Sequence, residues 1–487
     1  PDPDVIRVED TYYMVSTTMH FMPGCEILQS FDLVHWEHVT YVYETLDHTD
    51  AQQLKSGQNI YGQGMWAASL RYHEGRFCIC FVANDTRKTY LYTSEKIDGP
   101  WKKQLIEGFY HDGSLLFDED GRNYIVYGND EIWITELNED LTAPKKDGLH
   151  RLLVSDHKNP ELGYEGSHIQ KINGYYYIFL VHSLRDCWMR TEACFYSDSL
   201  EGEFTGGDVL CDDRGYCGQG VAQGGIVDTP DGKWYAMLFQ DSGAVGRIPI
   251  LLPVTWKDHF PFFGQNGHVP EEIEVHSTRP GYIYQPLVGS DDFCNGLLPR
   301  WQFNHDPDPR YYHLDALQGT YTITTREVCT ELTQAVNTLT QRMSYPSCAA
   351  EVTVDASALK EGDVAGLCAL QSCYAAVGIT KHHGKYEVLM LDKKEDGILD
   401  MTEGTVVESH QMDFRLEADF CNMKDEARCY YRVNKGDWLP IGTVHKLYFK
   451  LDHFTGCRFG LFCYAAEETG GSACFRDFKY YDVDEIS

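Results

Sequence analysis

The sequence predicts an all-β protein in two parts: a five-bladed β-propeller over residues 1–286, then an antiparallel β-sandwich over residues 287–487. Three observations predict this fold class. A polar turn followed by an aromatic-rich strand recurs through the first part, and short strands with turn residues between them fill the second. Helical periodicity is nearly absent throughout. Aromatic residues make up 13% of the chain and 43 residues are glycine, as expected of many strands joined by tight turns.

Five copies of the turn-and-strand pattern define the first part. They are RVEDTYYMVS (7–16), RYHEGRFCICFV (71–82), FDEDGRNYIVY (117–127), QKINGYYYIFL (170–180) and VDTPDGKWYAMLF (227–239). Their turns centre on Thr11, Gly75, Gly121, Gly174 and Gly232. Asn-Gly and Asp-Gly turns favour hairpins because both central residues need a positive φ. A second, weaker strand-and-turn pattern follows each copy, so each unit carries enough strands for a propeller blade. The alternative is an ordinary sandwich with coincidental hairpins.

The repeat places five side chains at one equivalent position. Counting back nine residues from each turn residue reaches Asp2, Trp66, Asp112, Glu165 and Gln223. Such positions lie at the start of the innermost strands and converge near the propeller axis. Three carboxyl groups at one place would repel one another and raise at least one pKa, which is typical of an active site. The alternative is that these residues cap strands or line a wet channel.

Two carboxyls and an aromatic platform are the groups that glycoside hydrolysis requires. One carboxyl must stay protonated to donate to the leaving oxygen, and the other must be ionised to accept a proton from water. A third carboxylate fits as a neighbour that raises the pKa of the donor. We therefore expect a catalytic centre in the propeller, with Trp66 stacked on a sugar ring.

Composition excludes several other classes of function. The chain has 41 basic and 74 acidic residues, a net charge of −33, which disfavours nucleic acid and anionic membranes as partners. No apolar run approaches the roughly 18 residues of a membrane helix. The 17 cysteines are scattered without a CxxC pair, which indicates small buried apolar residues in a reducing compartment. We expect a cytoplasmic rather than secreted protein, and because the chain begins at Pro1 without Met, an upstream export signal stays open.

Five motifs occur in chain order: PDPDVIRVEDTYYMVST (1–17), GMWAASLRYHEGRF (64–77), HDGSLLFDEDG (111–121), YEGSHIQKINGYYY (164–177) and GAVGRIPILLPVTW (243–256). Together they resemble glycoside hydrolase family 43, the inverting β-xylosidases and α-L-arabinofuranosidases with a five-bladed propeller. The C-terminal part resembles the concanavalin-like (jelly-roll) sandwich fused to xylosidases of this family. The resemblance covers essentially the whole chain.

The resemblance implies roles for four residues. Asp2 matches the general base, Glu165 the general acid, and Asp112 the acid that tunes the donor and orients the sugar. Arg247 matches an arginine that contacts substrate hydroxyls. The implied activity is exo-acting and inverting release of D-xylose or L-arabinose from the non-reducing ends of xylo-oligosaccharides or arabinoxylan fragments. The alternatives are a predominant α-L-arabinofuranosidase and, from another class, a non-catalytic carbohydrate-binding protein.

Three further residues are candidates for contact with the substrate. Phe21, in the loop MHFMPG (19–24), is expected to form a wall of the pocket, with loop packing as the alternative. Gln223 stands near the place where relatives often carry a His that is sometimes a metal ligand, so metal binding stays open. The second domain is expected to stabilise the propeller and narrow the pocket, with Phe454 in the loop DHFTG (452–456) as the candidate.

The expected partner is a small oligosaccharide, and the sequence leaves a homo-oligomer open. The resemblance implies no required cofactor. A structural calcium ion is compatible with two acidic pairs, although acidic turns on an acidic protein are usually solvated. These pairs are Asp118 with Asp120 and Asp306 with Asp308.

Overall fold

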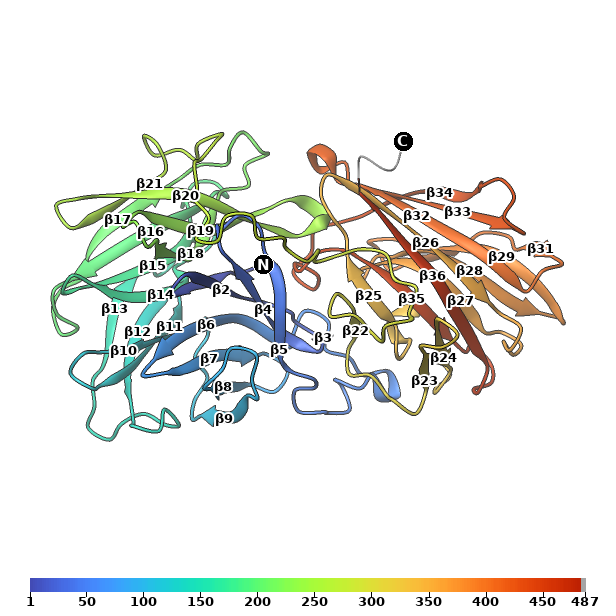
Figure 1. The fold of residues 1–487 in the computed structure, drawn as a ribbon, viewed down its shortest axis with the longest axis horizontal. Helices are drawn as coiled ribbons and strands as arrows, with labels where there is room; N and C mark the ends of the chain where they lie inside the picture. The colour runs from blue at the N-terminus through green and yellow to red at the C-terminus, as the bar shows by residue number, and fades with distance from the viewer. Residues whose placement is uncertain (483–487) are drawn as a thin grey trace.

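The computed structural model describes residues 1–482 and consists of two β-sheet domains that lie side by side (Figure 1). The first domain, coloured blue to green, contains five four-stranded sheets, and the second, coloured orange to red, contains two larger sheets. The predicted fold class, a five-bladed β-propeller followed by an antiparallel β-sandwich, is confirmed.

Each propeller blade is an antiparallel sheet of four strands in chain order. Blade one comprises β1 (Asp4–Val8), β2 (Thr11–Ser16), β4 (Gly24–Ser30) and β5 (Glu37–Tyr43), and blade two comprises β6 (Met65–His73), β7 (Arg76–Ala83), β8 (Lys88–Ser94) and β9 (Lys102–Ile106). Blade three comprises β10 (Ser114–Phe117), β11 (Asn123–Asn129), β12 (Glu131–Leu137) and β13 (His150–Ser155), and blade four comprises β14 (Glu165–Ile172), β15 (Tyr175–Ser183), β16 (Arg190–Ser197) and β17 (Thr205–Leu210). Blade five comprises β18 (Ala222–Asp228), β19 (Trp234–Asp241), β20 (Arg247–Lys257) and β21 (Phe260–Phe263). The first strands of neighbouring blades contact one another, and β1 contacts β18 to close the ring.

The hairpin turns follow the turn chemistry of the sequence, with one difference. Glu74 and Gly75 join the first two strands of blade two, and both have positive φ, as the tightest hairpins require. In blade one Val8 pairs with Thr11, so the turn lies between them and Thr11 begins the second strand. The predicted turn centre at Thr11 is therefore one residue too late. That blade has no glycine in its turn to fix the register of the repeat.

The sandwich is built from two facing antiparallel sheets. One contains, in spatial order, β3 (Phe21–Met22), β22 (Gln302–Asn304), β25 (Leu339–Arg342), β35 (Arg458–Tyr464), β27 (Val364–Leu370), β28 (Ala375–His382), β29 (Lys385–Lys393) and β30 (Leu399–Met401), with β31 (Thr405–Val407) also paired to β29. The other contains β23 (Tyr312–Asp315), β24 (Thr320–Thr324), β36 (Ser472–Asp482), β26 (Ser347–Asp355), β32 (Gln411–Asp419), β33 (Glu426–Val433) and β34 (Leu439–Lys446). Short 3-10 helices lie at η1 (Lys55–Gly57), η2 (Gly243–Val245), η3 (Leu332–Gln334) and η4 (Cys421–Met423).

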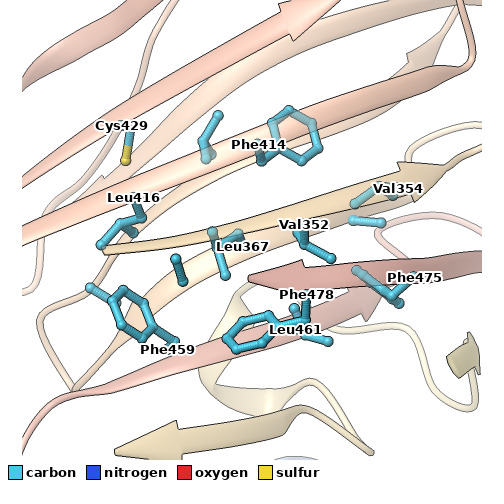
Figure 2. Packing of buried hydrophobic residues seen from close by; sticks show 14 of the residues in the cluster. Val352, Val354, Leu367, Phe414, Leu416, Cys429, Phe459, Leu461, Phe475 and Phe478 are labelled. Atoms are coloured by element: carbon cyan, nitrogen blue, oxygen red, sulfur yellow. The ribbon is translucent and has the colours of Figure 1, made fainter. Parts of the chain in front are cut away.

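Alternate residues of the facing strands form the sandwich core. Val352 and Val354 project from β26, and Phe414 projects from β32, toward Leu367 and Leu461 of the opposite sheet (Figure 2). This period of two is what a sheet with one buried face requires. Eleven of the seventeen cysteines are also buried, in agreement with their expected role as small apolar residues, and all seventeen, which lie within residues 1–482, are free thiols.

Strand β3 and the connecting segment both link the two domains. Strand β3, in the loop that follows β2, pairs with β22, so a loop of blade one is an edge strand of the sandwich sheet. Residues 264–301 connect the domains and contain the predicted boundary at 286/287. This connection is fixed to blade one, where the amide of Thr278 donates to the carbonyl of Phe31 at 2.7 Å. Within residues 1–482 the structure contains no helix long and apolar enough to span a membrane.

Candidate active site

The five residues that the repeat singles out lie at the entry to the innermost strands. Asp2 and Asp112 each stand two residues before the first strand of their blade. Trp66, Glu165 and Gln223 lie where a β-bulge interrupts the pairing of the first two strands. Bulges re-aim side chains and are enriched beside active sites. Asp2, Asp112 and Gln223 also have φ of 46°, 47° and 63°, a strained conformation that is enriched at functional sites.

Asp2 is held as a carboxylate. It is buried, with 4% of its surface exposed. Its Oδ1 accepts a hydrogen bond from Nη1 of Arg247, and its Oδ2 accepts one from the hydroxyl of Thr17 at 2.6 Å. Burial opposes ionisation, but the guanidinium of Arg247, then the amine of Pro1 and the Thr17 hydroxyl, outweigh it and lower the pKa of Asp2. A buried, ionised carboxylate is the group a general base requires.

Arg247 is fixed from several sides. Its Nε donates to Oδ1 of Asp241 at 3.2 Å, and the same carboxylate accepts a hydrogen bond from Arg190. The guanidinium lies 4.2 Å from the ring centroid of Phe454 and 4.4 Å from that of Phe239. These contacts hold the cation beside Asp2 in one orientation.

Asp112 has the opposite electrostatic environment. Burial is the largest cause that raises its pKa to about 6, and the carboxylates of Glu165 and Asp2 add to the rise while His111 opposes it. The amide of Gly166 donates to Oδ2 of Asp112 at 3.0 Å. Three carboxyl groups therefore influence one another at this site, as the sequence predicts, and Asp112 is the one whose pKa rises.

Glu165 is the most accessible of the three acids, with 21% of its side chain exposed. Its Oε2 accepts a hydrogen bond from Nδ2 of Asn129 at 2.8 Å. Nε2 of His111 lies 3.6 Å from the same oxygen and 3.7 Å from Oδ2 of Asp112. The Asp112 carboxylate, and then Glu165, raise the pKa of His111 to about 9 against the cost of burial. An imidazolium thus lies between the two carboxyls.

The sandwich contributes one side of this site. The rings of Phe454 and Trp66 meet edge to face at 5.5 Å between centroids, and Phe454 also covers Arg247. Trp66 lies 6.1 Å from the ring of His111. The structure therefore places Phe454, Trp66 and Arg247 beside the carboxyls, where the sequence analysis expects them.

Phe21 is not a wall of this pocket, contrary to expectation. It is fully buried in strand β3, packs in a core of the sandwich, and has the guanidinium of Arg458 3.6 Å above its ring. The alternative, loop packing, is correct. Local sequence cannot reveal this, because its strand partner is Asn304, far along the chain.

Gln223 is buried, and its contacts are with other residues of the propeller. Its backbone amide donates to Oε2 of the buried Glu192 at 2.7 Å, and its side chain lies against Gly166. A methyl group at Gly166 would come within 2.6 Å of Cγ of Gln223, so this position requires glycine. Glu192 is fully buried, and burial raises its pKa well above the ordinary value.

The acidic pairs considered for calcium have protein partners. Asp118 accepts hydrogen bonds from Lys171 at 2.6 Å and from the Tyr176 hydroxyl at 2.5 Å. Asp308 is paired with Arg310 at 2.7 Å. One carboxylate of each pair, Asp118 and Asp308, is therefore paired with a cationic side chain.

A second polar network lies deeper along the propeller axis and supports the site. Asp4 accepts hydrogen bonds from the Leu70 amide and from Arg71, both at 2.8 Å, and lies 3.1 Å from Nδ1 of His168. Burial opposes its ionisation, but Arg71 and His168 lower the pKa of Asp4 to about 2. Arg71 also donates to the hydroxyl of Ser114 at 2.7 Å. The first strands of four blades are tied together in this way.

Four residues that contact the carboxyls or their arginine were not predicted from the sequence. His111 could have been found, because it precedes Asp112 in the motif HDGS. The others reach the carboxyls from outside the repeat position, and nothing in their local sequence indicates it. They are Thr17, Asn129 and Asp241.

Comparison with known proteins decides the family. The family model described as glycosyl hydrolases family 43 matches residues 1–261, which is more than half of the chain. The chain belongs to glycosyl hydrolase family 43. Its second domain matches the family model described as the beta xylosidase C-terminal concanavalin A-like domain, over residues 290–481. This family 43 protein is a glycoside hydrolase with the expected accessory domain.

Relatives of this family 43 protein carry two kinds of name. A protein of Formosa agariphila named beta-xylosidase is 26% identical over 99% of the chain and 88% of its own length. A protein of Bacteroides ovatus named non-reducing end alpha-L-arabinofuranosidase is 23% identical over 82% of the chain and 78% of its own length.

Solved structures agree with the fold over the whole chain. A bifunctional GH43-CE protein of Bacteroides eggerthii has a TM-score of 0.92 at 42% identity, and the present chain spans 63% of its length. An engineered GH43 glycoside hydrolase, described as having both endo-xylanase and exo-arabinofuranosidase activity, has a TM-score of 0.86 at 27% identity. It aligns with 99% of the present chain and 98% of its own.

Proposed function

We propose that this protein is an inverting exo-glycoside hydrolase. It releases D-xylose, L-arabinose or both from the non-reducing ends of xylo-oligosaccharides or arabinoxylan fragments. The names of its relatives support this substrate class. The observation that carries the mechanism is the contrast between Asp2, which Arg247 keeps ionised, and the other two acids, Asp112 and Glu165, which face the same nitrogen of His111.

The proposed reaction is a single displacement. Asp2 accepts a proton from a water molecule, whose oxygen attacks the anomeric carbon. Glu165 donates its proton to the glycosidic oxygen as the carbon–oxygen bond breaks, and the aglycone leaves as an alcohol. Asp112 faces the same ring nitrogen of His111 as Glu165 does, and its role in the proposed reaction is to orient the sugar. The products are a free sugar of inverted configuration, a protonated Asp2 and an ionised Glu165, which then exchange protons with solvent.

The wall contributed by the sandwich supports action on chain ends. Phe454 packs across Trp66 and Arg247, beside the carboxyls and at the boundary between the domains. A pocket walled by a second domain admits a terminal sugar more readily than the interior of a polymer.

Side-by-side kinetics on p-nitrophenyl β-D-xyloside and p-nitrophenyl α-L-arabinofuranoside test the substrate class. We expect hydrolysis of at least one, and the ratio of kcat/KM gives the preference. The alternative, a predominant arabinofuranosidase, requires that ratio to favour the furanoside strongly. Binding of xylobiose without turnover of any glycoside would contradict the enzyme and favour a carbohydrate-binding protein.

The role of Glu165 is tested by its leaving-group dependence. Glu165→Gln should lower kcat on xylobiose by about 10²-fold or more, and on p-nitrophenyl xyloside much less, because a nitrophenolate leaves without a proton. Asp10→Asn, an acid paired with Arg279 on the surface, is the matched control. Equal losses on both substrates would contradict the assignment of Glu165 as general acid.

A further inference from the structure

The ring of His111 lies in the site although the repeat does not select it. It directly precedes Asp112, and its carbonyl accepts a hydrogen bond from the amide of Gly128 at 3.1 Å, which fixes the backbone. Its side chain is only 20% exposed. Its Nε2 lies 3.7 Å from Oδ2 of Asp112 and 3.6 Å from Oε2 of Glu165. One ring nitrogen therefore faces both carboxyls.

The two oxygens of Glu165 are not equivalent. Oε2 accepts the hydrogen bond from Asn129 at 2.8 Å and faces His111 as well. A proton on Oε2 would point toward two N–H groups, one that already donates to this oxygen at 2.8 Å and one 3.6 Å away on a cationic ring, and their positive hydrogens would repel it. The carboxyl proton is thus directed to Oε1.

We propose that His111 is a positioning residue of the catalytic centre. As an imidazolium it holds Oδ2 of Asp112 and Oε2 of Glu165, leaves Oε1 as the oxygen that delivers the proton, and stabilises the Glu165 carboxylate formed by that step. This inference rests on the proposed function. Atoms and charge balance: the proton passes from Oε1 to the glycosidic oxygen, and the new negative charge lies beside the imidazolium.

The charged groups around the ring agree with this role. Asp112 and Glu165 face it, and both raise the pKa of His111, whereas the guanidinium of Arg87 acts in the opposite direction. The two acids outweigh burial and the Arg87 cation, which favours the charged ring at neutral pH. The neighbouring Trp66 is uncharged and lies 6.1 Å away between ring centroids.

The variant His111→Gln removes the positive charge of the ring but keeps an N–H donor at this position. In His111→Gln the acid loses its cationic neighbour and holds its proton more tightly, so the alkaline limb of the pH profile of kcat/KM should move upward by about half a unit or more. The kcat on methyl β-xyloside should fall about tenfold or more, with a smaller loss on the p-nitrophenyl glycoside. His111→Lys, which restores the charge, should return the alkaline limb toward the wild-type position.

His73→Gln is the matched control. His73 is the last residue of strand β6, at the end opposite Trp66, and its ring stacks on Phe117 at 4.6 Å between centroids. This variant should leave both the pH profile and the leaving-group dependence unchanged. The proposal would be overturned if His111→Gln lowered kcat equally on the methyl and p-nitrophenyl glycosides while the alkaline limb and the Tm stayed at their wild-type values. His111 would then have only a structural role.

A second measurement needs neither a substrate nor a folded His111 variant. In protein labelled with ¹⁵N-histidine, His111 should stay protonated to a higher pH than a surface histidine. Asp112→Asn should make it titrate at lower pH, which also identifies its signal. An ordinary histidine titration in the wild type would overturn the proposal. Failure of the proposed function is distinct, because wild-type protein would then hydrolyse neither glycoside whatever His111 does.

Discussion

Individual contacts decide which carboxyl carries a proton. Asp2 and Asp112 occupy equivalent places in two blades, yet the pKa of Asp2 is lowered and that of Asp112 is raised. Of these two acids, Arg247 bonds to Asp2. The repeat could identify both acids, since each stands nine residues before a predicted turn. It could not assign their roles, because Arg247 comes from another blade and approaches through the fold.

Removal of Arg247 should raise the pKa of Asp2. In Arg247→Met the base stays protonated to higher pH, so the acidic limb of the kcat/KM profile should move upward by about one unit or more. Rates measured from pH 4 to pH 8 on p-nitrophenyl xyloside give this shift. Arg279→Met removes an arginine from a surface ion pair and should leave the acidic limb in place. An unmoved limb in Arg247→Met would show that another group is the base.

Among the elements, strand β3 shows how far a local pattern can mislead. Its two residues read as a loop between strands of blade one, but they pair with β22 of the sandwich and bury Phe21 beneath Arg458. Phe21→Ala should therefore destabilise the protein by about 3 kcal/mol, the typical cost of a large cavity, and leave KM within about twofold of the wild type.

Urea unfolding and steady-state kinetics on the same Phe21→Ala preparation distinguish a core residue of the sandwich from a residue that contacts the substrate. Val34→Ala, at a half-exposed residue of the same blade, is the control and should change neither stability nor KM. A large rise in KM at unchanged stability would return Phe21 to the pocket.

The elements that sequence predicts well are those with local causes. Turns such as Glu74–Gly75 and Asn173–Gly174 have the positive φ that their residues favour, so the hairpins and the blade repeat can be predicted. The bulges at Trp66, Glu165 and Gln223 cannot, because nothing in the local sequence marks the extra residue. The bulges lie at the start of the innermost strands, where an extra residue changes the direction in which these side chains point.

At the scale of the whole molecule, three buried histidines lie at the boundary of the domains. His20 comes from blade one, and His305 and His453 come from the sandwich, with ring centroids 4.9 and 5.3 Å from that of His20. Neither ring nitrogen of His20 has a hydrogen-bond partner among residues 1–482. Burial, and then the neighbouring histidines and Arg458, lower the pKa of His20, and burial with His453 lowers that of His305 to about 3.

His20 and His305 should make the folded protein sensitive to acid. Both are neutral when folded but take up protons near pH 6.5 when unfolded, so their contribution is fully present above that pH and is lost as the pH falls toward 3. Each such histidine adds a slope of up to about 1.4 kcal/mol per pH unit to the free energy of unfolding. His20→Phe should flatten the slope between pH 6.5 and 4.5, measured by urea unfolding. His35→Phe, at an exposed histidine, should leave it unchanged, and equal slopes in the wild type and His20→Phe would contradict the assignment.

The anomeric configuration of the first-formed product distinguishes inversion from retention. Xylobiose is mixed with the enzyme, and proton NMR spectra are recorded before mutarotation equilibrates the released sugar. We expect α-D-xylose to appear first from the β-linked substrate, because Asp2 activates a water on the face opposite the bond that Glu165 protonates. Initial formation of β-D-xylose would contradict it, since retention requires a covalent intermediate on one of the carboxylates.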